Sequence, residues 1–125
     1  MSSRRRRYAS LPPSEPRLLD GARLFNDGEF FASHEVWEAL WRELDGEERE
    51  LLQGLIQVAA AYYHLVRGNQ TGARYLYGRA RARLARWMPS HAGVDVGGLL
   101  AQIDRDFSTT SGAVLSSRPR IIVGG

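Results

Sequence analysis

The residues best suited to chemistry lie on one face of an aromatic-rich segment, residues 29–44. His34 and Glu38 are four positions apart, so on a helix they lie within about 40° of each other, and Trp41 lies about 20° from His34. The apolar face of an amphipathic helix normally excludes ionisable groups, because burying an unpartnered imidazole or carboxylate costs several kcal/mol. We therefore expect a partner for His34 and Glu38 elsewhere in the fold.

A second line of polar side chains lies on residues 47–67, a segment that is apolar on nearly every other side. Such a segment is typical of a helix at the centre of a bundle. Its polar residues Gln53, Gln57 and His64 fall within about 40° of each other on a helical wheel. Small residues flank them, which would allow another backbone or a ligand to approach closely.

The two polar lines face each other if the segments form an antiparallel hairpin that turns near residues 45–46. In that register Glu38 lies opposite Gln53, and His34 lies opposite Gln57. The sequence therefore predicts a buried polar ladder between the two helices.

The ladder contains the side-chain types of a metal site. His34, Glu38 and His64 would suit zinc, manganese or iron with an open coordination position. Glu38 or Glu35 could then act as a base on a metal-bound water, which makes them the candidate catalytic residues of a metal-dependent hydrolase. The neighbouring side chains expected to contact the bound group are Gln53, Gln57 and Trp41.

Two other interpretations remain open. The same ladder could be a fully hydrogen-bonded structural network that fixes the register of two helices without any ligand. The chain could also be a non-enzymatic interaction module, monomeric or homodimeric, that binds an acidic partner such as nucleic acid. Its basic side chains would be Arg4 to Arg7 and the arginines of residues 71–88. Solvated arginines that pair with acids elsewhere are the simpler interpretation of these residues.

Turn residues divide the chain into helical segments, and no strand-like alternation competes with the helical period. Short loops favour antiparallel neighbours. The prediction is an all-α, antiparallel up-and-down bundle of four to five helices over residues 15–107. A disordered arginine-rich arm is expected over residues 1–14, and an irregular tail over 108–125, extended near 118–123. The predicted helices run from a cap at Ser14 to a break at 26–28, then over about 29–44, 47–67, 71–88 and 96–107.

The composition of the chain excludes several classes of function. The chain has 125 residues, no cysteine and a net charge of +3, so disulfides and thiolate chemistry are excluded. The longest apolar run, residues 58–63, is too short to span a bilayer, and we expect no membrane partner. The first arginines have no apolar stretch behind them, unlike a secretory signal. A cytoplasmic location is therefore expected.

Two stretches form a recognisable pattern. The first reads Phe25-Asn26-x-Gly28-x-Phe30-Phe31-x-x-His34-Glu35-x-x-Glu38-x-x-Trp41. The second reads Gln53-Gly54-Leu55-Ile56-Gln57, and Tyr63-His64 and Gly68-Asn69 follow it. Over about residues 18–86 the chain resembles the bacterial and archaeal domain-of-unknown-function family numbered 309. The resemblance implies a small all-helical domain, sometimes labelled a predicted metal-dependent hydrolase. The positions that match its motif are His34, Glu35, Glu38, Trp41, Gln53, Gln57 and His64.

Overall fold

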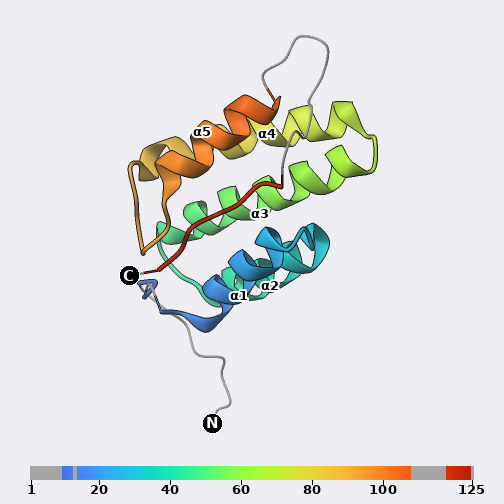
Figure 1. Cartoon of the computed structure of the whole chain (residues 1–125). Helices are drawn as coiled ribbons and strands as arrows, with labels where there is room; N and C mark the ends of the chain where they lie inside the picture. Colours follow the sequence, from blue (N-terminus) through green and yellow to red (C-terminus); the bar gives the residue numbers. More distant parts are fainter. Residues whose placement is uncertain (1–9, 13, 108–117, 125) are drawn as a thin grey trace.

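A computed structural model describes residues 10–12, 14–107 and 118–124 as five α-helices, one short 3-10 helix and connecting segments (Figure 1). No strand longer than an isolated bridge occurs in these residues, so the predicted all-α bundle is confirmed. None of the helices in this part of the chain is long and apolar enough to cross a membrane. The elements are α1 (Pro16–Asn26), α2 (Phe30–Glu43), α3 (Glu48–Val66), α4 (Gln70–Leu84), η1 (Ala85–Trp87) and α5 (Val96–Phe107).

Local chemistry explains where the helices begin and end. Helix α1 is capped by Glu15, whose carboxylate accepts from the Arg17 N–H, rather than by the predicted Ser14. Gly28 adopts a positive φ of 83° and allows the sharp turn between α1 and α2. Asn69 caps α4, with its Oδ1 accepting from the Gly72 N–H at 3.0 Å. The predicted fourth helix ends earlier than expected, at Leu84, before the 3-10 turn η1.

Helix α3 is the central element, as its apolar character predicts. It packs against both α2 and α4, while α1 covers α2 and α5 lies against α4 (Figure 1). Tyr62 of α3 lies at the centre of an aromatic cluster, with ring centroids 5.2 to 5.6 Å from those of Phe25, Phe30 and Phe107. Four of the five α-helices contribute a ring to this cluster, so it holds the bundle together.

Two glycines allow helices to approach closely. An added Cβ on Gly54 of α3 would lie 2.7 Å from Cδ2 of Leu84, so α4 packs directly over this position. An added Cβ on Gly21 of α1 would lie 2.1 Å from Nε1 of Trp37 on α2. The first contact sets how closely α4 approaches α3, and the second sets how closely α1 approaches α2.

The described tail, residues 118–124, contains no helix and forms one antiparallel bridge, between Val94 and Val123. It passes between α5 and α1 (Figure 1). Residues 1–9, 13, 108–117 and 125 lie outside the described residues, so the predicted disorder of the arginine-rich arm stays a prediction.

Candidate functional site

A pocket between α2 and α3 brings together two of the predicted site residues. His34 of α2 and His64 of α3 both line it, and its volume is about 140 Å³. The other lining residues are Phe31, Ala60 and Tyr63. On each helix the lining residues are spaced three or four apart, so each helix presents one stripe to the pocket.

Aromatic rings form much of the wall of this pocket. The Phe31 ring centroid lies 5.5 Å from that of His34 and 5.4 Å from that of Tyr63. Tyr63 lies 5.8 Å from His64, with the two rings steeply inclined. Phe31 is half exposed, at 50% of its full accessible surface, which leaves the pocket open to solvent on that side.

His34, which lines this pocket, has an unusual buried polar atom. Its Nδ1 is buried and has no hydrogen-bond partner among the described residues. Leaving a buried donor or acceptor unpaired costs about 1–3 kcal/mol. Native structures seldom leave such an atom unpaired without a reason, and a ligand or an ordered water is one such reason.

His64, by contrast, has a defined hydrogen bond. Its Nδ1 lies 3.1 Å from Nδ2 of Asn69. The Asn69 amide is oriented by its capping bond, because its oxygen accepts from the Gly72 N–H. Its nitrogen must therefore donate to the imidazole, and in the neutral ring the proton lies on Nε2. The cap of α4 thus fixes the tautomer of a residue that lines the pocket.

The predicted polar ladder between α2 and α3 does not form. The Glu38 side chain is 39% exposed and pairs with Arg42 one turn later, at 3.3 Å. Gln57 is buried, but its Oε1 accepts from Nε of Arg83 on α4, at 3.1 Å. Within the described chain no hydrogen bond joins His34 to Gln57. The ladder was wrong because α3 packs against two helices, and α4 supplies a charged donor to the buried amide.

The remaining predicted site residues lie apart from the pocket lining. Glu35 is exposed, and Gln53 is half-buried. Trp41 is also half-buried, and the guanidinium of Arg49 covers its ring at 3.9 Å from the centroid. No group of three His, Cys, Asp or Glu side chains in the described residues is placed to hold a metal ion. A metal role for His34, Glu38 and His64 therefore stays a prediction.

A match to a known family covers the two helices that form the pocket. Residues 18–76 match the family described as "Domain of unknown function (DUF309)". The chain carries a DUF309 domain. No curated protein matches the chain. The matched residues include both pocket histidines, most of α1, all of α2 and α3, and the first half of α4, whereas α5 and the tail lie outside them.

Most arginines of α4 that follow the DUF309 match pair with acids on other helices. Arg81 bonds Asp104 of α5 through two nitrogens, each at 2.9 Å. Arg83 pairs with Glu50, and just after α4 Arg86 pairs with Glu47 at 2.8 Å. The predicted pairing with distant acids is confirmed for these three arginines. Arg74 instead donates to the Phe107 carbonyl, and Arg79 lies over the Tyr75 ring. The other arginines predicted to bind an acidic partner, Arg4 to Arg7, lie outside the described residues.

Sequence reasoning missed a buried polar contact of the DUF309 domain with α5. The Tyr62 hydroxyl donates to Oδ2 of Asp106 at 2.6 Å, and both side chains are buried. Burial, followed by this hydrogen bond, raises the pKa of Tyr62 far above its ordinary value. A signal was present in the sequence, because Asp106 falls about 20° from Leu99 on the helical wheel, on the apolar face.

Proposed function

We propose that the DUF309 domain binds a small aromatic or heteroaromatic molecule in the pocket between α2 and α3. The observation that carries this proposal is the buried Nδ1 of His34, which has no partner among the described residues. A turn of the His34 ring that brought this atom to the pocket surface would let a ligand bond it and would remove a penalty of about 1–3 kcal/mol. Binding would therefore draw part of its free energy from a cost already present in the unliganded fold.

The size of the pocket supports a ligand of about one ring. Its volume is about 140 Å³. A cavity of roughly 150 Å³ is large enough to hold benzene. The faces of Phe31 and Tyr63 and the methyl group of Ala60 provide an apolar lining for a flat molecule.

The polar groups of the pocket favour a ligand that forms hydrogen bonds over one that carries a positive charge. The described residues that line the pocket include no acid. His64 supplies a second polar contact, because Asn69 occupies its Nδ1 and its Nε2 keeps a proton to donate. A phenol or an azole has both the ring and the hydrogen-bonding group that this arrangement would take.

A divalent metal ion is the second candidate ligand. His34 and His64 line the same pocket, and imidazole is a common ligand of zinc, manganese and iron. This pair of side chains supports the metal candidate. Water or a substrate would complete the coordination, and Glu35 or Glu38 would be the base of a hydrolytic reaction. This candidate has less support, since Glu38 already pairs with Arg42.

An NMR titration of the full chain with phenol, and separately with Zn²⁺ alone, tests both candidates. We expect phenol to shift the signals of Ala60, Tyr63 and His34 in a saturable way. His34→Leu should abolish these shifts, whereas His91→Leu, a histidine change away from the pocket, should leave them intact. Equal phenol binding by the His34→Leu variant would contradict the proposal. Saturable shifts with Zn²⁺ but not with phenol, lost in both His34→Leu and His64→Leu, would replace it with the metal candidate.

A further inference from the structure

The C-terminal segment, residues 118–124, contacts the helical domain in the way that a bound peptide contacts its receptor. It lies between α1 and α5, which are far apart in the sequence (Figure 1). Its contacts come from α1, from α5 and from the loop that precedes α5. We call the surface formed by Asn26, Gln102 and residues 93–95 the tail groove.

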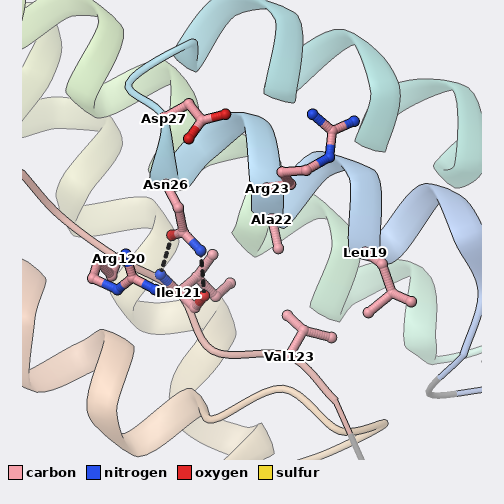
Figure 2. A pocket seen from close by; sticks show the side chains of 8 residues that line it. All are labelled: Leu19, Ala22, Arg23, Asn26, Asp27, Arg120, Ile121 and Val123. Atoms are coloured by element: carbon pink, nitrogen blue, oxygen red, sulfur yellow. Dashed lines mark hydrogen bonds between the residues drawn. The ribbon is translucent and has the colours of Figure 1, made fainter.

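Two amide side chains hold the main chain of the segment. Asn26 at the end of α1 donates from Nδ2 to the Ile121 carbonyl at 3.0 Å, and its Oδ1 accepts from the Ile121 N–H at 2.7 Å (Figure 2). Gln102 of α5 does the same to the preceding residue, Arg120, at 3.2 and 2.9 Å. Such paired contacts bind the backbone of an extended chain whatever side chains it carries.

The loop before α5 continues this main-chain recognition. The Asp95 N–H donates to the Ile122 carbonyl at 2.9 Å, and the Gly124 N–H donates to the Gly93 carbonyl at 2.9 Å. Val94 and Val123 form the antiparallel bridge between these two bonds. The segment therefore pairs with the loop through one β-bridge and its flanking bonds, as a peptide does when it pairs with the edge of a sheet.

Side chains of the segment alternate between buried and exposed. Pro119 is buried and Ile121 is 2% exposed, while Arg120 is exposed and Ile122 is 63% exposed. Two buried anchors two residues apart are what an extended peptide presents to a surface. These anchors would give the tail groove its sequence preference, whereas Asn26 and Gln102 would provide affinity for any extended backbone.

The surface around the Val123 side chain encloses it less tightly than the surfaces around Pro119 and Ile121 enclose those side chains. Its side chain lines an open pocket of about 350 Å³, together with Leu19, Ala22 and Arg23 of α1 (Figure 2). A peptide with a larger residue at this position would therefore still fit. The tail groove has room for sequences other than the one that now occupies it.

We propose that the tail groove is a binding site for extended peptides that carry proline and isoleucine two residues apart. Residues 118–124 are its resident ligand, and a matching segment of another chain displaces them. The covalent connection keeps the resident segment next to the tail groove, so a free peptide competes poorly until this segment is released.

Binding of a labelled peptide to full-length variants tests this proposal. The probe is a fluorescein-labelled peptide with the sequence of residues 118–124, and the readout is fluorescence anisotropy. Ile121→Ser removes the buried anchor of the resident segment but leaves Asn26 and Gln102 in place. We expect this variant to bind the probe at least about tenfold more tightly than the wild type does. The matched control Ile122→Ser changes an exposed isoleucine and should behave like the wild type.

Two further measurements establish where the probe binds. Adding Asn26→Ala to the Ile121→Ser variant should weaken probe binding again, because one of the two main-chain contacts is lost. A probe with serine in place of the isoleucine equivalent to Ile121 should not bind. Equal probe affinity for the Ile121→Ser and Ile122→Ser variants would overturn the proposal.

Hydrogen exchange of the wild type can overturn the proposal even if Ile121→Ser fails to fold. A displaceable segment opens locally, so the amides of Arg120 and Ile121 should exchange faster than the core amides of α3. If these two amides are as protected as the α3 core, the segment is released only by global unfolding. That result would also overturn the proposal.

Discussion

The hydroxyl group of Tyr62 donates a 2.6 Å hydrogen bond to the carboxylate of Asp106, in the interior of the bundle. It joins the C-terminal half of α3 to the last turn of α5. Helix α5 lies outside the residues that match the DUF309 family, so this bond attaches the added helix to the family domain. A buried carboxylate needs such a partner, because an unpaired one costs far more than the bond itself contributes.

Removing the Tyr62 hydroxyl should therefore destabilise the protein. Tyr62→Phe keeps the ring in the aromatic cluster but leaves the Asp106 carboxylate without this donor. We expect the free energy of unfolding to fall by about 1–3 kcal/mol in chemical denaturation. Tyr75→Phe is the matched control, since Tyr75 is 62% exposed, and it should change stability by less than about 0.5 kcal/mol. Equal effects of the two substitutions would contradict this role for Asp106.

The same contact predicts how stability depends on alkaline pH. Burial, followed by the hydrogen bond to Asp106, raises the pKa of Tyr62, so the folded state keeps this phenol neutral. In the unfolded chain the Tyr62 phenol releases its proton at about pH 10. The stabilising contribution is therefore fully present below about pH 10 and is lost as the pH rises further. We expect the free energy of unfolding to decline less steeply above this pH in Tyr62→Phe than in the wild type. Parallel curves would show that Tyr62 is not the group responsible.

Close packing of α1 on α2 gives a prediction at Gly21, for which Gly78 of α4 is the control. An added Cβ on Gly21 would lie 2.1 Å from Nε1 of Trp37, a fully buried side chain whose N–H donates to the Leu18 carbonyl at 3.2 Å. Gly21→Ala should displace Trp37 and lower the free energy of unfolding by about 1–3 kcal/mol. An added Cβ on Gly78, on the exposed side of α4, has no atom within 4 Å. Gly78→Ala should therefore raise the free energy of unfolding by roughly 0.5–1 kcal/mol. Equal signs of the two effects in thermal denaturation would contradict the packing argument.

The helical fold could be predicted because it depends on periodicity and turn chemistry within single segments. The apolar pattern of residues 96–107 predicts the bounds of α5 correctly. The fourth helix was overextended, because periodicity does not distinguish a final α-helical turn from the 3-10 turn η1.

The partners across helices could not be predicted in the same way. A helical wheel shows which residues share a face, but not which neighbouring helix covers that face. Gln57 and His64 lie close together on the wheel of α3, yet Gln57 bonds Arg83 of α4 while His64 lines the pocket with His34 of α2. Asn26 was interpreted only as a helix breaker, because main-chain contacts such as its pair with Ile121 leave no trace in periodicity.

The orientation of His64 can be tested through its neighbour Asn69. Asn69→Ala removes both the cap of α4 and the donor to Nδ1 of His64, and it should lower the free energy of unfolding by about 1 kcal/mol. Asn69→Asp keeps a capping oxygen but cannot donate, so Nδ1 must carry a proton to keep the contact. We expect the ¹⁵N shift of Nδ1 to change from that of an acceptor to that of a donor only in Asn69→Asp. An unchanged shift in both variants would contradict the assigned tautomer.

The two histidines of the pocket should respond oppositely to replacement by leucine. His34→Leu removes a buried nitrogen that has no partner among the described residues, so the free energy of unfolding should stay unchanged or rise by up to about 1 kcal/mol. His64→Leu removes an acceptor of the Asn69 amide, and stability should fall by about 1 kcal/mol. If His34→Leu gains stability but loses phenol binding, His34 contributes to binding and lowers the stability of the fold. If His34→Leu instead costs as much as His64→Leu, His34 is structural, and the proposed ligand loses its main support.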